Sequence, residues 1–199
     1  MPSVAEASPT DPWLDGWLPL VIERAGGGPI LELGCGSGRD TRTLAGAGLR
    51  VVGLELNAAA VASARERVPS AQFHCQDIRA PFPLPDGTSG VVLASLCLHY
   101  FDWPETTALA ERIRRQLRPG GVLLCRLNST LDVHHGAIAG WSGEDPFYLV
   151  DGIPKRFFDR AAVDRLFASG WRPISVEHHV VERYAQPKAL WEAVLERLD

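Results

Sequence analysis

Residues 30–57 decide the fold of this chain, and they read ILELGCGSGRDTRTLAGAGLRVVGLELN. An apolar run ends in an acid, Glu32, and a turn with glycine at every second position follows directly. A helix-like stretch comes next, and a second apolar run ends in another acid, Glu55. Glycine lacks Cβ, so the backbone of such a turn bends sharply and lets a ligand approach closely. A carboxylate at the end of the second strand suits the two hydroxyls of a ribose, so we expect a nucleotide-like ligand at the first βα turn of a doubly wound sheet.

The glycine spacing narrows the choice of ligand. The dinucleotide fingerprint places its third glycine three positions after the second, and this chain has Arg39 there. The third glycine comes one residue earlier, at Gly38. The pattern E-x-G-x-G-x-G, with Glu32, Gly34, Gly36 and Gly38, resembles motif I of the class I S-adenosylmethionine (SAM)-dependent methyltransferases. This spacing disfavours a nicotinamide-dependent oxidoreductase, as does the lack of a recognisable Tyr-x-x-x-Lys.

Bulk composition indicates one globular domain. The chain has 199 residues, of which 46% are hydrophobic and 22% charged, with a formal net charge of -4. Without basic runs we expect no nucleic-acid surface, and without a long apolar segment we expect no membrane span. The first ten residues lack the basic and apolar parts of a signal peptide, so we expect a loose tail over residues 1–11 and a cytoplasmic protein. The four cysteines form no C-x-x-C pair, and Cys75, Cys97 and Cys125 should behave as small apolar residues in strands.

Strand and helix signals alternate along the chain, which favours a parallel sheet flanked by helices. We expect one domain over residues 12–199, opening with a cap helix at 12–24 that Asp11 caps and Pro19 kinks or splits. The fold class is α/β, a Rossmann-like, doubly wound, mostly parallel sheet of six or seven strands with helices on both faces. The expected strands are 29–33, 50–55, 71–76, 91–96 and 122–127, and the expected helices between them are 39–47, 58–67 and 105–117.

The second part of the chain gives weaker signals. Periodicity disappears after Asn128, so residues 128–156 are expected to form a substrate loop or lid. A helix at 159–169 and a strand at 173–183 should follow. The chain should close with an amphipathic helix that bears Leu190, Trp191, Val194, Leu195 and Leu198.

The order of elements over residues 12–184 also resembles the class I methyltransferase domain, and the turn LRPGG at 117–121 is similar to a hallmark of that family. The resemblance implies SAM as cofactor, with Glu55 on the ribose, Leu56 beside the adenine, and Gln76, Asp77 and Ile78 near the adenine amino group. The full set of cofactor contacts that we expect is Glu32, Gly34, Cys35, Gly36, Gly38, Glu55, Leu56, Gln76, Asp77, Ile78, Ser95 and Leu96. A closer similarity is to the small-molecule branch with tellurite-resistance-type and thiopurine-type enzymes.

The family usually ends in a strand hairpin, whereas this chain shows one clear strand after residue 170. Either Val180 to Tyr184 bends into a second strand, or the seventh strand is missing.

Methyl transfer from a sulfonium is an in-line displacement, so holding donor and acceptor in line supplies most of the acceleration. A base is needed only if the nucleophile arrives protonated. The candidates for orienting or deprotonating an acceptor are His99, Tyr100, His134 and His135, each of which could equally be structural or solvated. Adjacent histidines point apart and no third ligand is spaced for them, so we expect no metal. Candidate substrate contacts are Trp13, Trp17, Asn128, Trp141 and Tyr148.

Several features point to a small-molecule acceptor. Methyltransferases that modify amino groups of nucleobases or glutamine often carry an Asn/Asp-Pro-Pro-aromatic segment after strand 4, and this chain reads Ser95-Leu96-Cys97-Leu98 there. The chain is too short for a separate target-recognition domain, and we expect a monomer or a homodimer. The sequence therefore predicts a SAM-dependent methyltransferase of small molecules. The alternative is a SAM-binding module without catalysis that acts as a sensor or partner subunit.

Overall fold

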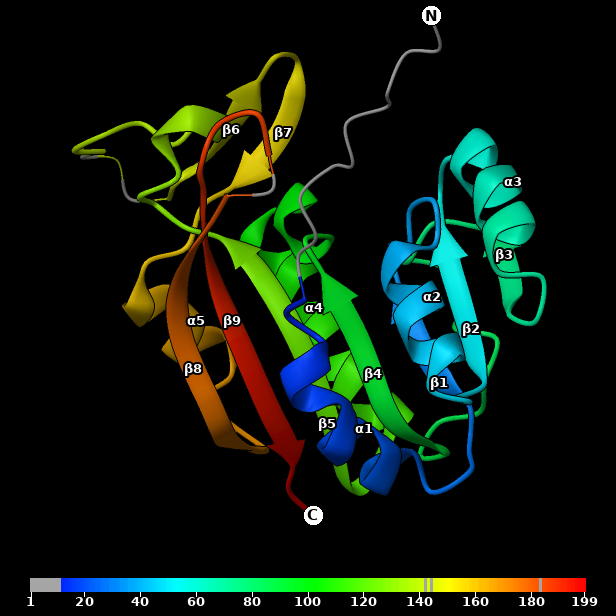
Figure 1. The fold of residues 1–199 in the computed structure, drawn as a ribbon. Helices are drawn as coiled ribbons and strands as arrows, with labels where there is room; N and C mark the ends of the chain where they lie inside the picture. The colour runs from blue at the N-terminus through cyan, green and yellow to red at the C-terminus, as the bar shows by residue number, and fades with distance from the viewer. Residues whose placement is uncertain (1–11, 142, 144, 183) are drawn as a thin grey trace, which may run out of the picture.

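The computed structural model describes residues 12–141, 143, 145–182 and 184–199. The expected tail at 1–11, including the cap residue Asp11, lies outside the described residues. A seven-stranded sheet runs through the molecule in the order β3-β2-β1-β4-β5-β9-β8 (Figure 1). Strands β1 to β5 are parallel, whereas β9 pairs antiparallel with both β5 and β8. The strands of this sheet are β1 (Ile30–Leu33), β2 (Val51–Glu55), β3 (Gln72–Cys75), β4 (Ser89–Ser95), β5 (Leu117–Asn128), β8 (Trp171–Val181) and β9 (Lys188–Arg197).

Helices cover both faces of the sheet, and each face has its own apolar core. On one face α4 (Trp103–Gln116) and α5 (Arg160–Leu166) bury residues such as Ile113 and Val163. On the other face α1 (Leu18–Ala25) and α2 (Arg39–Gly46) bury residues such as Val21 and Leu44 (Figure 1). Helix α3 (Ala58–Arg67) packs in a third cluster beside β3. The expected doubly wound α/β fold is confirmed.

Capping and proline residues in the sequence correctly predicted the start of α3 and the split of the N-terminal helix. Asn57 caps α3 by accepting from the backbone N–H groups of Ala59 and Ala60, at 2.9 and 3.0 Å. The expected split of the N-terminal helix is also found, because a short 3-10 helix, η1 (Asp15–Trp17), precedes α1. Pro19 then lies in the first turn of α1, where its missing N–H leaves no hydrogen bond unmade. The LRPGG segment belongs to β5, which is longer than expected.

The expected closing helix is wrong, because residues 188–197 form strand β9. The sequence KALWEAVLER is made largely of good helix formers, but tertiary pairing overrides that preference. β9 fills the space between β5 and β8 and is hydrogen-bonded on both sides. Its side chains enter both cores, since Ala193 and Leu195 pack on one face of the sheet and Val194 on the other. The seventh strand is therefore present. It is formed by residues 188–197, so both alternatives drawn from the sequence, a second strand at Val180 to Tyr184 or a missing strand, are wrong.

Residues 128–156 contain more structure than a loop. They include the 3-10 helix η3 (Val133–His135) and the hairpin of β6 (Phe147–Val150) and β7 (Ile153–Arg156). The hairpin lies at the end of the sheet where the parallel strands finish (Figure 1). Arg156 fixes it there, because its guanidinium donates to Phe101 O and to the Asp145 carboxylate, and lies over the Trp103 and Phe147 rings.

All four cysteines are free thiols, but two of them depart from expectation, because Cys97 lies after β4 and not in a strand, and Cys75 is not buried. Cys35, Cys97 and Cys125 are buried, whereas Cys75 is exposed at the end of the edge strand β3. Edge strands present one side to solvent, which the apolar character of the segment did not reveal. Among the helices of the described residues, none is long and apolar enough to cross a membrane.

Candidate active site

The glycine turn after β1 places three residues in left-handed conformation, with φ of 65° at Gly34, 54° at Gly36 and 76° at Gly38. A Cβ at Gly34 would come within 2.6 Å of the Cys97 Cβ, and one at Gly38 within 3.2 Å of the Ala64 Cβ. These two glycines therefore permit close packing. A Cβ at Gly36 would meet nothing within 4 Å, so the backbone there faces open space. Gly36 is the position where a ligand would lie against the turn.

Glu55, at the end of β2, is held directly against this turn. Its Oε2 accepts from the Gly36 N–H at 3.0 Å, and its Oε1 accepts from the Asn57 N–H at 2.8 Å. Each carboxylate oxygen can accept a second hydrogen bond, so the group retains acceptor capacity for a ligand. The expected acid and the expected glycine turn are thus one connected unit.

Two cavities meet at this end of the sheet. The first, named the Glu55 cavity, has a volume of about 880 Å³, and the second, named the Lys155 cavity, has a volume of about 410 Å³. They share Gly34, Leu96 and Tyr100, so they adjoin at the glycine turn and the end of β4. Leu96 takes a positive φ of 55° there, which is rare for a residue with a side chain. Cofactor candidates that line the Glu55 cavity are Gly34, Glu55, Leu56, Asp77, Ile78 and Leu96, and those that line the Lys155 cavity are Glu32, Gly34, Cys35, Gly36, Ser95 and Leu96.

Two expected cofactor residues lie outside both linings. Gly38 packs against Ala64, and the Gln76 side-chain amide donates to Pro81 O at 3.2 Å. Asp77 does line the Glu55 cavity, but its carboxylate is bonded by the Arg79 guanidinium at 2.7 to 3.1 Å. These bonds lower the pKa of Asp77. Sequence reasoning missed Arg79, although a basic residue two positions after the acid was a signal that could have identified it.

Glu32 is buried behind the glycine turn and accepts a hydrogen bond from the Thr41 hydroxyl. Burial, reinforced by the nearby charge of Asp40, raises the pKa of Glu32 to about 8. Asp40 lines the Lys155 cavity and accepts from the Trp13 indole N–H at 3.3 Å. The sequence did not single out Asp40, because an acid in the first turn of a helix is commonplace.

The Lys155 cavity is also lined by two buried polar groups that have no hydrogen-bond partner among the described residues. His99, in the 3-10 helix η2 (Leu98–Tyr100), is 3% exposed, and Asn128, at the end of β5, is 2% exposed. Within the described residues, neither His99 Nδ1 nor Asn128 Oδ1 has a hydrogen-bond partner. Burial, together with the charges of Lys188 and Lys155, lowers the pKa of His99 to about 3, so its ring is neutral at pH 7. Buried polar atoms without a partner are uncommon, and here they line a cavity that a ligand could fill.

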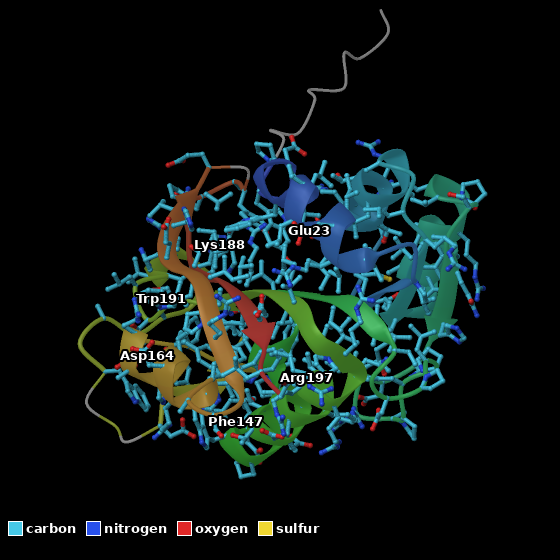
Figure 2. All side chains as sticks on the ribbon, turned by 90° about the horizontal axis from the view of Figure 1, so that it is seen from below. Glu23, Phe147, Asp164, Lys188, Trp191 and Arg197 are labelled. Atoms are coloured by element: carbon cyan, nitrogen blue, oxygen red, sulfur yellow. The ribbon has the colours of Figure 1, made fainter. Side chains whose placement is uncertain are left out.

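A buried ion pair includes Lys188, which lines this cavity. Asp132 is fully buried, and its Oδ2 accepts from the Lys188 ammonium at 2.7 Å. Its Oδ1 accepts from the Ala189 N–H at 3.0 Å and lies 2.9 Å from His135 Nδ1. Lys188 begins β9, at the opposite end of the strand from Arg197 (Figure 2). Burial and the charges of Lys155 and Arg126 lower the pKa of Lys188, although the bond to Asp132 opposes this shift.

The structure separates the other expected catalytic and substrate residues. His99 and His135 line the Lys155 cavity and Tyr100 lines both cavities, whereas His134 is exposed and lines neither. The Trp17 indole donates to Glu192 at 2.8 Å, and Trp13 packs under the Arg126 guanidinium. Trp141 stacks on Tyr148, whose hydroxyl is bonded to backbone groups of Ile138 and Gly136. None of these four aromatic residues lines either cavity, and the hairpin instead contributes Phe147, Ile153, Pro154 and Lys155.

Comparison with known proteins agrees with this architecture. Residues 30–121 match the family described as "Methyltransferase domain". The chain is 31% identical over 174 residues to trans-aconitate 2-methyltransferase of Paracidovorax citrulli, which covers 84% of this chain and 65% of that protein. It is 35% identical over 101 residues to the enzyme of the same name from Delftia acidovorans, over 49% of this chain and 37% of that protein. The chain thus spans about two thirds or less of the length of these relatives.

Solved structures show the same fold. A SAM-dependent methyltransferase from Methanosarcina mazei superimposes with a TM-score of 0.72 at 18% identity, over 85% of this chain and 92% of that one. A 1,6-didemethyltoxoflavin-N1-methyltransferase from Burkholderia thailandensis, solved with its ligand and S-adenosylhomocysteine, gives 0.71 at 19% identity, over 95% and 82%. The finer similarity to tellurite-resistance-type and thiopurine-type enzymes stays a prediction. Residues 30–121 thus match a methyltransferase-domain family, and the glycine turn and the strand order are similar to those of the class I S-adenosylmethionine-dependent methyltransferases.

Proposed function

We propose that this protein transfers a methyl group from SAM to a small-molecule acceptor. The observation that carries the proposal is the junction of the Glu55 and Lys155 cavities at Gly34, Leu96 and Tyr100. An in-line displacement needs donor and acceptor to meet at one point from opposite sides. Two adjoining compartments with the glycine turn between them provide that arrangement.

The residues present fit the cofactor. Gly36 leaves open space against the turn, and the Glu55 carboxylate retains acceptor capacity for ribose hydroxyls. Leu56, which is 67% exposed, and Ile78 supply apolar surface for an adenine in the Glu55 cavity. When bound, SAM supplies an electrophilic methyl group on a sulfonium. The chain itself binds, orients and shields the reacting groups from water.

The part of the Lys155 cavity that is lined by His135, Lys155 and Lys188 is the proposed acceptor compartment, and its two lysines favour an anionic acceptor. No carboxylate within the described part of the chain forms an ion pair with Lys155. The buried acid beside it, Asp132, is already bonded by Lys188, Ala189 and His135. A ligand carboxylate would neutralise Lys155. By its name, the relative from Paracidovorax citrulli acts on trans-aconitate, which is a carboxylate, and this supports the same class of acceptor here.

Calorimetry with SAM, S-adenosylhomocysteine and NAD tests the cofactor. We expect the first two to bind and NAD not to bind, and tight NAD binding would contradict the proposal. Release of S-adenosylhomocysteine in a panel of small carboxylates then tests the acceptor. Cofactor binding without turnover of any acceptor would favour the alternative of a SAM-binding module.

We also propose a cytoplasmic location, for which the support is the four free thiols, since a reducing compartment keeps cysteines unpaired. The expectation of a monomer or homodimer without nucleic-acid partners stays a prediction. Sedimentation of the purified protein would test the oligomeric state.

A further inference from the structure

His135 and Asp132 form a pair of the kind that prepares a histidine to accept a proton. His135 Nδ1 lies 2.9 Å from Asp132 Oδ1, and the His135 side chain is 25% exposed while Asp132 is fully buried. The other imidazole nitrogen, Nε2, has no hydrogen bond to another described residue. Because His135 lines the Lys155 cavity, that nitrogen is the one left for a ligand.

The surroundings of Asp132 determine which nitrogen of His135 carries the proton. Asp132 accepts from the Lys188 ammonium and from the Ala189 N–H, which are both donors. A carboxylate paired with an ammonium in this way stays ionised and can only accept. His135 Nδ1 must therefore donate to it, which leaves the lone pair on Nε2 in the neutral ring. An acid that holds the imidazole in one tautomer and stabilises the imidazolium is the arrangement found in catalytic triads.

We propose that His135, positioned by Asp132, is a general base that deprotonates a hydroxyl group of the acceptor. This inference rests on the proposed methyl transfer and adds the chemical class of the acceptor, a small hydroxycarboxylate. The carboxylate of the acceptor lies on Lys155, and its hydroxyl faces His135, since both residues line one cavity. The product is a methyl ether, whereas methylation of the carboxylate itself would need no base.

The atoms and electrons balance without a further reactant. The O–H bond breaks and its proton goes to His135 Nε2, which gives an imidazolium paired with Asp132. The oxygen lone pair forms the new O–C bond with the methyl carbon, while the C–S bond breaks and its electron pair returns to sulfur. The positive sulfonium becomes a neutral thioether, and the imidazolium then releases its proton to solvent.

The remaining groups around His135 suit this role. In the same segment as His135, Asp132 is bonded to the imidazole Nδ1. The ring of Tyr184, which is distant in sequence, lies edge-on to the imidazole, with the ring centroids 5.6 Å apart. From β9 and β7, Lys188 and Lys155 add positive charge, which attracts the anionic acceptor. The fourth neighbour in the cavity, His99, is neutral at pH 7.

A spectroscopic test is independent of any acceptor. Nitrogen chemical shifts of the 15N-labelled protein report which imidazole nitrogen carries the proton, and the His135→Gln variant assigns the signal. We expect the proton on Nδ1 at neutral pH, and we expect Asp132→Asn to remove this preference. A proton on Nε2 in the unmodified protein would overturn the proposal whatever the enzyme methylates.

A kinetic test uses matched acceptor pairs: malate against succinate, and 3-hydroxybenzoate against benzoate. We expect S-adenosylhomocysteine release only with the hydroxylated member of a pair, and a product that survives alkali because it is an ether. His135→Gln should lower kcat by about 10²–10⁴-fold and flatten the rise of kcat with pH, with SAM affinity unchanged. His134→Gln is the matched control, since that side chain is exposed and outside both cavities, and it should leave kcat unchanged.

The outcomes separate the two proposals. Equal turnover of hydroxyl-free carboxylates, or an alkali-labile ester product, would overturn the role of His135 and leave the methyltransferase assignment intact. Unchanged kcat in His135→Gln would do the same. A protein that binds SAM but releases no S-adenosylhomocysteine with any probe would contradict the proposed function. The proposed role of His135 as a general base would then be rejected as well.

Discussion

The two halves of the site are built in different ways. The Glu55 side depends on neighbours in sequence, because the glycine turn follows β1 directly and Glu55 binds Gly36 and Asn57 within 19 residues. The Lys155 side depends on distant residues, because Asp132 is bonded by Lys188 and Ala189, which lie 56 and 57 residues away. The first half is thus encoded in a short motif, while the second exists only when β9 is inserted beside β5.

The two halves of the site also differ in how their charged groups are compensated. The Glu55 carboxylate bonds backbone N–H groups and remains accessible to a ligand. Asp132 and Lys188 are removed from water, so each depends on the other for compensation. We therefore expect changes on the Lys155 side to affect folding, and changes on the Glu55 side to affect binding.

The largest effect should follow from breaking the buried ion pair. Asp132→Ala leaves the Lys188 ammonium buried without its counter-charge, and such a loss typically costs about 3–5 kcal/mol of the free energy of unfolding. Urea titration followed by circular dichroism measures it. Asp164→Ala is the control, because its i,i+4 pair with Arg160 is exposed and should contribute less than about 1 kcal/mol. Equal losses in the free energy of unfolding for the two substitutions would show that the buried pair contributes no more to stability than an exposed pair does.

A second comparison separates packing from binding within the glycine turn. Gly34→Ala places a Cβ 2.6 Å from the Cys97 Cβ at a positive φ, so overpacking of about 1–3 kcal/mol adds to about 1–2 kcal/mol of backbone strain. Gly36→Ala incurs only the strain, since its Cβ meets nothing within 4 Å. We expect Gly34→Ala to be the less stable variant in urea, and Gly36→Ala to fold but bind SAM weakly in calorimetry. Strong SAM binding by Gly36→Ala would mean that no ligand lies against the turn.

The contrast between the halves explains how much of the fold the sequence predicts. Asn57, the glycine turn and the acids at the strand ends act through local hydrogen bonds and backbone conformation, so their positions could be predicted to within a few residues. Residues 188–197 could not, because their helical preference is outweighed by hydrogen bonds to β5 and β8 and by burial on both faces. No window of ten residues contains that information.

The same reasoning applies to the candidate site. Of the four expected catalytic residues, His134 and His135 are adjacent in sequence, and the structure distinguishes them because only His135 bonds Asp132 and lines the Lys155 cavity. The aromatic residues Trp141 and Tyr148 were reasonable lid candidates, but they stack on each other instead of lining a cavity. Lys155 lines the cavity that we propose for the acceptor, and nothing in its sequence neighbourhood distinguishes it from an ordinary surface charge. Long-range pairing therefore decides which polar residues belong to the site.

Glu55→Ala tests the locally encoded half with an intermediate effect. Removing a charged hydrogen-bond partner of the ligand should weaken SAM binding by about 1–3 kcal/mol, while the fold is retained. Calorimetry gives the affinity, and the urea midpoint serves as the folding control. Unchanged affinity would mean that the end of β2 does not contact the cofactor. A loss of stability as large as that of Asp132→Ala would remove the distinction between the two halves.

The smallest expected effect is on the pH dependence of stability, where two buried residues of the Lys155 cavity, His99 and Glu32, act in opposite directions. Burial lowers the pKa of His99 to about 3 and raises that of Glu32 to about 8, from ordinary values of 6.5 and 4.5. Below pH 6.5 the unfolded chain takes up a proton that folded His99 does not, so this residue makes stability fall with falling pH. Above pH 4.5 the unfolded chain releases a proton that folded Glu32 keeps, so this residue makes stability fall with rising pH up to about 8.

Between pH 4.5 and 6.5 these two contributions oppose each other, each with a slope of up to about 1.4 kcal/mol per pH unit. His99→Leu should therefore make the protein more stable as pH falls across this window, relative to the unmodified chain. Glu32→Gln should remove the loss of stability between pH 6.5 and 8, with the Thr41 hydrogen bond retained by the amide oxygen. Urea titrations at four pH values would measure both slopes. If both variants followed the pH dependence of the unmodified chain, neither the buried histidine nor the buried acid would determine how stability varies with pH.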